Sequence, residues 1–468
     1  MLLIKNGFVM DPRSGRNGIY DILIKENTIE KIESFIDEMD FTNEECKDLD
    51  IINAEGMMVA PGLVDVHVHF RDPGFTYKED IYTGAKAAAK GGFTTVVLMA
   101  NTKPTVDNEE TLRYVIDKGA DTDIHVLTCG SITKGLQGKE LVDMDSLKTA
   151  GAVGFTDDGI PIMDESTVIT AMKKAKELNV PLSFHEENPE LITNNGVNHG
   201  KASAHYEIEG SPRAAEIDLI YRDLQLAGEL DAPINIQHIS SKEGVELVRQ
   251  KKIEMTKKKN IPLPLPKSNE NMTDITDTSN FNKSVTQMIP MDVAQVINIH
   301  AEATPHHFSL NEEAVIKYGT MAKMNPPLRT EEDRMAIIQG LKDNTIDIIA
   351  TDHAPHSAEE KGKAITDAPS GIIGLETALS LGITNLVKEG HLTYMQLLEK
   401  MTINPAVMYH LDCGHISVGG PADLVIFNEN SYVVDSFCSK SSNSPFKGET
   451  LTGEVQYTIC NGKVIYQL

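Results

Sequence analysis

The chain has 468 residues, of which 40% are hydrophobic and 24% are charged, with no sustained low-complexity stretch. This is typical of a globular protein with two or three domains, or of one large barrel with a smaller partner domain, and it excludes a mini-protein and a disordered chain. The 43 Lys and Arg residues against 69 Asp and Glu residues give a formal net charge of -26, which argues against nucleic acid and anionic membranes as partners.

The cysteines and the N-terminal residues indicate the compartment. Five cysteines, an odd number without a CxxC pair, favour neither a disulfide framework nor a thiolate zinc site. Lys5 and Asp11 lie where a signal peptide would need an apolar core, and no run reaches the roughly 18 apolar residues of a membrane span. We therefore expect a cytoplasmic protein.

Short β segments are predicted at both ends of the chain. The N-terminal part contains LLIKNGFVM, YDILIKENTIEKIE and DIINAEGMMVAPG, and the C-terminal part contains PADLVIFNEN, YVVDSF and GEVQYTICNGKVIYQL. Asn461 and Gly462 form an Asn-Gly hairpin signal. We expect residues 1–60 and 405–468 to pair into one small β-sandwich domain.

Between these ends, short apolar runs alternate with segments of helical periodicity, which is the pattern of βα units and a parallel sheet. The eight runs span residues 62–70, 93–102, 123–131, 152–158, 180–187, 233–240, 297–307 and 347–355. The helical segments include KEDIYTGAKAAAKGG, DESTVITAMKKAKELN and SPRAAEIDLIYRDLQLAGEL. Since eight strands close a TIM barrel, we expect an α/β fold in which residues 61–404 form a (β/α)8 barrel.

One connection is unusually long. Residues 254–296 are rich in Lys, Asn, Thr, Ser and Pro, and they read as an insertion between a helix and the seventh strand. Because a helix-to-strand connection lies at the bottom of such a barrel, we expect this segment to lie opposite the catalytic face. Its excision should spare turnover.

Several predicted strands end in side chains that bind metal ions. The residues at these ends are His67, His69, Asp157, Asp158, His185, His238 and Asp352. His67 and His69 are two apart on a strand and so point to one face. Imidazole with carboxylate suits catalytic zinc, and six ligand groups are too many for one four-coordinate ion. We therefore expect two metal ions that share a bridging carboxylate, which Asp158 can supply.

Seven segments of the chain resemble those of a known family. The segments PGLVDVHVHFRDPG, GFTDDG, SFHEEN, QHIS, TPHH, KMNPPLR and ATDHAPH, in this order across residues 61–356, resemble the amidohydrolase superfamily and, within it, the larger, type I dihydroorotases of bacteria. VGGPADLVIF is similar to the family's return into its small β domain. The resemblance implies a cyclic amide hydrolase of pyrimidine biosynthesis that reversibly converts N-carbamoyl-L-aspartate into L-dihydroorotate.

The resemblance also implies the roles of the metal-binding residues. The ligands of two Zn²⁺ ions per subunit would be His67, His69, Asp158, His185, His238 and Asp352. The family's FTDDG segment favours Asp158 over Asp157 as the bridge. Asp352 would in addition act as the general acid/base that moves a proton to the departing ring nitrogen.

A second set of residues would bind the substrate. It comprises His69, Arg71, Asn101, Asn325, His356, Ser370 and Gly371. The planar guanidinium of Arg71 can grip a carboxylate through two hydrogen bonds. By resemblance, Asn101 and His356 join Arg71 around the carboxylate of dihydroorotate, and Asn325 contacts the ring. Two residues depart from the family pattern: Ala100 stands where Pro is usual, and Ser370 replaces an aromatic residue.

Two other functions stay open. One is a related cyclic amidase, namely a hydantoinase, dihydropyrimidinase or allantoinase. The other is a non-catalytic dihydroorotase-like scaffold of aspartate transcarbamoylase. The resemblance suggests a homodimer and, as protein partner, aspartate transcarbamoylase. We expect structural roles for His306 and His307, and ordinary packed or exposed positions for His125 and the remaining histidines.

Overall fold

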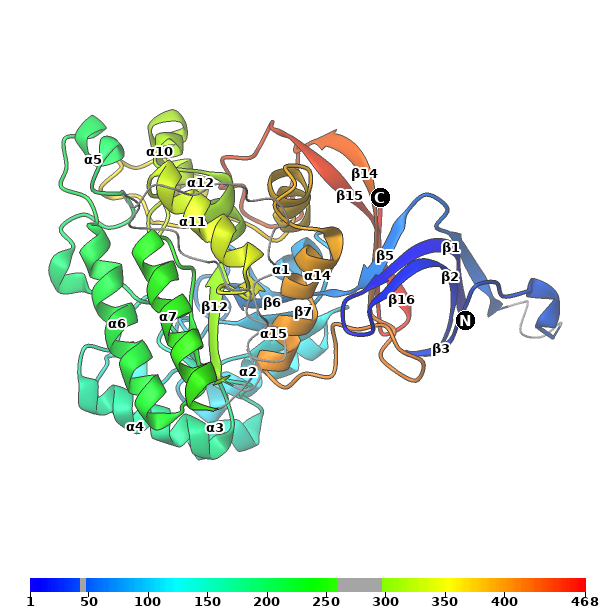
Figure 1. Cartoon of the computed structure of the whole chain (residues 1–468), viewed down its shortest axis with the longest axis horizontal. Helices are drawn as coiled ribbons and strands as arrows, with labels where there is room; N and C mark the ends of the chain where they lie inside the picture. The colour runs from blue at the N-terminus through cyan, green and yellow to red at the C-terminus, as the bar shows by residue number, and fades with distance from the viewer. Residues whose placement is uncertain (43–47, 260–296) are drawn as a thin grey trace, which may run out of the picture.

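The computed structural model describes residues 1–42, 48–259 and 297–468 (Figure 1). Its larger part is a barrel of eight parallel strands: β6 (Leu63–Val68), β7 (Phe93–Leu98), β8 (His125–Thr128), β9 (Phe155–Thr156), β10 (Leu182–Phe184), β11 (Ile234–Ile236), β12 (Ile299–Ala303) and β13 (Ile348–Ile349). Parallel bridges from Val68 to His353 and from Gly130 to Phe155 join the two groups of strands and close the barrel. Each of the eight predicted runs contains one of these strands, so the predicted barrel is confirmed.

Helices surround the barrel. The longer ones are α1 (Ile81–Lys90), α2 (Glu109–Ala120), α3 (Met144–Ala150), α4 (Glu165–Leu178), α6 (Arg213–Leu230), α7 (Lys242–Lys258), α11 (Glu331–Lys342) and α14 (Tyr394–Met401). The shorter ones are α5 (Lys201–His205), α9 (Pro305–Ser309), α10 (Glu313–Tyr318), α12 (Ala358–Lys361), α13 (Ala378–Gly382) and α15 (Ile403–Met408). Helix α4 shows why they form where they do: Asp164 caps the Thr167 N–H at its start, and Asn179 ends it in the left-handed conformation.

The predicted insertion begins later than the sequence indicated. Helix α7 continues through Lys258, and Met255 and Thr256 are buried on it. The assignment of residues 254–258 to an inserted segment was therefore wrong. Lys259 caps the end of this helix, and the rest of that prediction, residues 260–296, lies outside the described residues.

The two ends of the chain form a separate β domain, as expected (Figure 1). Its strands are β1 (Leu2–Asp11), β2 (Arg16–Lys25), β3 (Thr28–Glu33), β4 (Asp50–Asn53), β5 (Met58–Pro61), β14 (Leu424–Val433), β15 (Thr450–Cys460) and β16 (Lys463–Gln467). All eight are hydrogen-bonded into one continuous sheet, in which N-terminal β5 pairs with C-terminal β14. The Asn-Gly hairpin between β15 and β16 has φ values of 50° at Asn461 and 73° at Gly462, the left-handed backbone that this turn requires.

The small sheet has an apolar core of its own, but it also contributes to the core of the barrel, because Ala60, Val425 and Phe427 cluster with barrel residues. Ile4, Ile22 and Leu424 belong to the core of the small sheet, and Ile416 joins them. Met408, which lies earlier in the chain, packs instead with Val64 and other residues of the barrel strands. A division of the chain near residues 61 and 405 stays a prediction.

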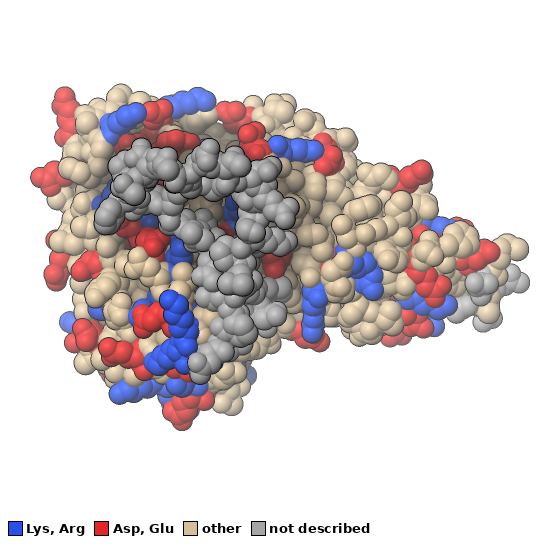
Figure 2. All heavy atoms as spheres, viewed as in Figure 1, with Lys and Arg blue, Asp and Glu red and all other residues tan. Residues whose placement is uncertain are grey.

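The surface fits the mixed charge composition. On the described part of the face shown in Figure 2, acidic and basic side chains are interspersed and form no continuous basic surface. Within the described ranges, no helix combines the length and the apolar character that a membrane span requires.

Candidate metal centre at the mouth of the barrel

Six predicted ligands meet where the parallel strands end. His67 lies on β6 and His69 follows it, Asp158 follows β9, His185 follows β10, His238 follows β11, and Asp352 follows β13. All six are at least nine-tenths buried. Because the carboxyl ends of the strands of a closed parallel barrel lie on one face, side chains far apart in sequence converge there.

One group of ligands surrounds His67 and His69. The Nε2 atom of His67 lies 3.3 Å from Asp158 Oδ1 and 3.6 Å from Asp352 Oδ1. The Nε2 atom of His69 lies 3.0 Å from Asp352 Oδ1 and 3.5 Å from Asp158 Oδ2. His67, His69 and Asp158 thus place three ligand atoms within 4.8 Å of one another.

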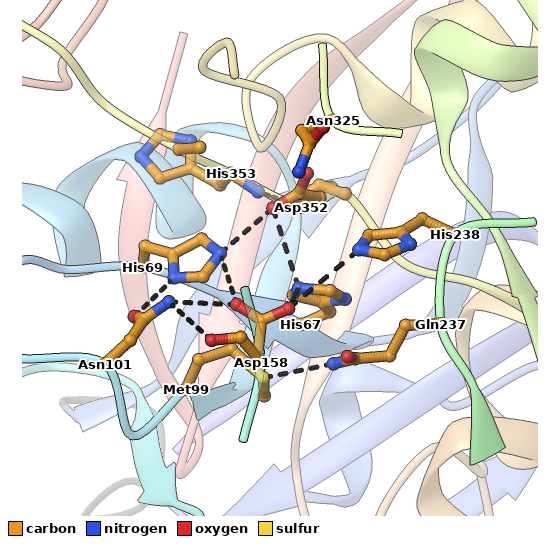
Figure 3. Close-up of polar contacts among 12 residues, drawn as sticks. His67, His69, Met99, Asn101, Asp158, Gln237, His238, Asn325, Asp352 and His353 are labelled. Atoms are coloured by element: carbon orange, nitrogen blue, oxygen red, sulfur yellow. Dashed lines mark hydrogen bonds and ion pairs between the residues drawn. The ribbon is translucent and has the colours of Figure 1, made fainter. Parts of the chain in front are cut away.

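The second group shares Asp158 with the first. The Oδ1 atom of Asp158 lies 3.8 Å from His185 Nδ1 and 3.9 Å from His238 Nε2. Figure 3 shows the Asp158 carboxylate between His69, His67 and His238. Asp158 therefore stands where a bridging ligand of two ions must stand.

These side chains fit metal ions better than they fit one another. His67 Nε2 is buried without a hydrogen-bond partner. The Nδ1 atom of His185 and the Nε2 atom of His238 face each other at 3.0 Å, and both nitrogens are free to bind an ion when they carry no proton. Nitrogen and carboxylate oxygen are the donors of catalytic zinc sites. The donor set therefore suits two divalent cations.

The protonation of Asp158 and His238 also suits a metal site. Burial disfavours the ionised form of Asp158, but His67, His69 and His185 hold its pKa well below the usual value. Burial, together with His185 and His67, holds the pKa of His238 well below the usual value. Asp158 is thus an anion and His238 is neutral, as metal binding requires. Burial lowers the pKa of His67 and His185, but the neighbouring carboxylates raise it above the usual value, so these two rings lose a proton when an ion binds.

The neighbouring Asp157 points elsewhere. Its Oδ1 atom accepts the backbone N–H groups of Ile132 at 2.7 Å and Thr133 at 3.0 Å. Burial raises its pKa to about 6. Asp157 thus holds the loop after β8, which supports the choice of Asp158 as the bridge.

Two further residues orient the histidines. The Oε2 atom of Glu302, on β12, lies 3.0 Å from His67 Nδ1. The Oδ1 atom of Asn101 lies 3.0 Å from His69 Nδ1, and its Nδ2 donates to Asp158 Oδ2 at 2.9 Å. Such contacts fix the ring orientation of a metal-binding histidine. Sequence reasoning missed Glu302, although a glutamate inside a buried strand is itself a signal of function.

A cavity of about 420 Å³ opens above the cluster. The predicted substrate-binding residues that line it are His69, Arg71, Asn101, Asn325, His356, Ser370 and Gly371. Five of the six metal-ligand candidates line it too, whereas His67 lies deeper. Asn195, Lys323 and Asp367 also line it, and the sequence did not indicate them because they lie in loops without regular periodicity.

Arg71 and His356 form one wall of the cavity. Arg71 Nε donates to the carbonyl of Pro355 at 3.3 Å, and its Nη2 lies 3.4 Å from His356 Nε2. Burial, followed by the positive charges of Arg71, Lys361 and Lys78, lowers the pKa of His356 far below its usual value. His356 is therefore neutral, and the positive charge on this wall comes from Arg71.

The lining of the cavity also offers unpaired polar atoms. Asn325 Oδ1 and Ser370 Oγ are buried without a hydrogen-bond partner in the described structure. Gly371 has a φ of 112°, and a Cβ atom there would lie 2.6 Å from the Ala354 side chain, so only glycine fits. Both oxygen atoms are therefore available to hydrogen-bond a molecule in the cavity.

His307, on α9, fixes a loop that borders the site. His307 Nε2 donates to the carbonyl of Pro326 at 3.1 Å, and its Nδ1 faces Thr304 Oγ1 at 2.8 Å. These contacts fix the loop that carries Asn325. They agree with the structural role expected for His307.

Comparison with known proteins places the chain among hydrolases of cyclic amides. Residues 58–465 match the model of the amidohydrolase family. A dihydroorotase of Clostridioides difficile is 54% identical over 467 residues, and one of Clostridium acetobutylicum is 50% identical over 470 residues, each with 100% of both chains covered. Among solved structures, an L-hydantoinase of Arthrobacter aurescens has a TM-score of 0.81 at 23% identity, covering 100% of this chain and 96% of that one. At this identity the likeness shows the fold alone.

Proposed function

The chain belongs to the amidohydrolase family, and from that premise we propose that its cavity carries out the dihydroorotase reaction, the reversible closure of N-carbamoyl-L-aspartate to L-dihydroorotate. Relatives that carry the name dihydroorotase match it over its full length at 45–54% identity. The observation that carries the substrate assignment is the position of Arg71, which lines the same cavity as the clustered ligands. Dihydroorotate bears a carboxylate for this guanidinium, whereas hydantoin and dihydrouracil do not.

The acid/base role falls to Asp352. Divalent cations bound to the six ligands would supply Lewis acidity, which polarises a carbonyl group and acidifies water. Asp352 Oδ1 lies 3.0 Å from His69 Nε2 and faces the cavity. In ring opening, Asp352 accepts a proton from the attacking water and returns it to the departing ring nitrogen. In ring closure, it takes the proton from that nitrogen and gives it to the departing carboxyl oxygen, which leaves as water.

The remaining wall residues hold the substrate. Arg71 pairs with the carboxylate, next to the neutral imidazole of His356. The free Oδ1 atom of Asn325 is available to accept an N–H of the ring. Asn101 already contacts His69 and Asp158, so it would orient these ligands while it borders the carboxylate.

Metal, assembly and compartment complete the proposal. The histidine and aspartate donors support two Zn²⁺ ions per subunit. We also propose a homodimer and, as its protein partner, aspartate transcarbamoylase. The four cysteines of the described chain are all free, which supports the reducing environment of the cytoplasm.

The two other functions are less well supported. A non-catalytic scaffold does not require metal ligands that converge, whereas all six ligand candidates meet here. A hydantoinase or allantoinase shares the metal centre, but its substrate offers no carboxylate to Arg71.

Assay of the purified full-length chain tests the proposal. L-dihydroorotate should be hydrolysed, a chelator should abolish turnover, and added Zn²⁺ should restore it. Hydantoin, dihydrouracil and allantoin are the matched controls. Preference for one of these controls, or activity that survives removal of the metal, would contradict the proposal.

A further inference from the structure

A second group of potential ligands lies at the other end of the barrel. His125 begins β8, whereas the catalytic ligands follow the carboxyl ends of the strands. Asp423 immediately precedes β14, and Cys460 ends β15. Ligand atoms of these three residues all lie within 4.8 Å of one another. We propose that His125, Asp423 and Cys460 bind a thiophilic divalent cation, of which Zn²⁺ is the natural example.

The group is held in place by its surroundings. His125 Nε2 lies 2.9 Å from Asp423 Oδ2, while Asp423 Oδ1 accepts the backbone N–H of Asn461 at 2.8 Å. Cys460 Sγ lies 3.8 Å from the carbonyl of Thr94 on β7. Two of the three side chains are therefore fixed by contacts that do not involve the cation.

An ion can reach this group from solvent. Asp423 and Cys460 are 3% and 1% exposed, whereas the side chain of His125 is 36% exposed. The histidine thus forms the entrance, and the carboxylate and thiol form the buried floor. A water molecule on the solvent side can complete the coordination, as in zinc sites with three protein ligands.

The donors select the kind of cation. Zinc binds sulfur at about 2.3 Å and nitrogen or oxygen at about 2.0–2.2 Å, so ligand atoms around a tetrahedral ion lie roughly 3.3–3.8 Å apart. Here His125 Nε2 and Asp423 Oδ2 are 2.9 Å apart, and the sulfur of Cys460 lies within 4.8 Å of a ligand atom of each. A thiolate donor disfavours Ca²⁺ and Mg²⁺, which take oxygen ligands.

The local charge favours a cation. The carboxylates of Asp423 and Asp123 both act electrostatically on the sulfur of Cys460. The charged and titratable groups near this sulfur are Asp423, Asp123 and the imidazole of His125. Burial, followed by Asp423 and Asp123, raises the pKa of the Cys460 thiol, so the thiol must lose its proton to bind the ion. The bound ion then offsets the repulsion between this thiolate and the two acids.

The bound ion would connect the two parts of the molecule. His125 belongs to the barrel, whereas Asp423 and Cys460 belong to the small sheet. Because a ligand that binds only the folded state stabilises it, the ion should strengthen the junction between barrel and sheet. This site is independent of the proposed reaction.

Cobalt substitution of the full-length protein tests the site. A thiolate bound to Co²⁺ gives a near-ultraviolet sulfur-to-cobalt charge-transfer band, and the catalytic cluster has only nitrogen and oxygen donors. The Co²⁺-loaded wild type should show this band, and Cys460→Ser and His125→Gln should each lose most of it. The control Cys438→Ser, which removes an exposed thiol, should keep it.

The number of zinc ions bound per chain provides a second test of the site. After gel filtration of zinc-loaded protein, Cys460→Ser should hold about one ion per chain less than wild type and Cys438→Ser. His125 is partly exposed, so His125→Gln should fold even if Cys460→Ser does not. A wild type without the cobalt band, or a band and zinc content that survive in folded Cys460→Ser or His125→Gln, would overturn the proposal.

Discussion

Substitution of Arg71 by Gln tests how the cavity recognises its substrate. Gln keeps a polar side chain but removes the charge and the planar fork that pairs with a carboxylate. A hydrogen bond to a charged group contributes about 1.5–3 kcal/mol. At about 1.4 kcal/mol per factor of ten, kcat/KM for L-dihydroorotate should fall about 12- to 140-fold. The loss should appear mainly as a higher KM, because Arg71 binds the carboxylate and not the reacting atoms.

Two controls make this experiment specific. Arg113→Gln removes an exposed arginine on α2 and should leave kcat/KM unchanged. The methyl ester of dihydroorotate lacks the negative charge, so its inhibition constant should change little between wild type and Arg71→Gln. An unchanged KM for dihydroorotate, or an equal loss with the ester, would refute the assigned contact.

Three more predictions follow from the same site and its supporting loop. Asp352→Asn should remain folded by circular dichroism while kcat falls about 100-fold or more, and near-normal turnover would remove Asp352 from the acid/base role. Asp158→Asn should lower the metal content measured by elemental analysis, whereas its neighbour Asp157→Asn should keep it; equal losses would contradict the bridging assignment. Lys361 donates to the carbonyl of Pro369 in the loop that lines the cavity. Burial, and then Lys323, lowers its pKa from 10.5 to about 7, so wild-type stability should decrease as pH falls through this interval. In urea unfolding, Lys361→Met should show a weaker pH dependence there than wild type, and parallel curves would contradict this account.

The sequence was most informative where polar side chains interrupt apolar runs. His185 and His238 end short buried strands, and polar residues at such ends have no packing role to explain them. The number of runs then identified the barrel, even though β9 and β13 have only two residues each.

Contacts between distant segments were beyond sequence reasoning. Nothing near Glu302 in the chain shows that it faces His67, which lies 235 residues away. The end of helix α7 was missed for a related reason. Met255 and Thr256 are buried on this helix, so a lysine-rich segment that resembles an exposed loop is the packed last turn of α7.

The metal centre itself can be observed by anomalous X-ray scattering at the zinc edge from crystals of the zinc-loaded protein. We expect two peaks at the mouth of the barrel, on either side of the Asp158 carboxylate, one next to His67 and His69 and the other next to His185 and His238. Anomalous density that leaves this cluster empty would contradict it.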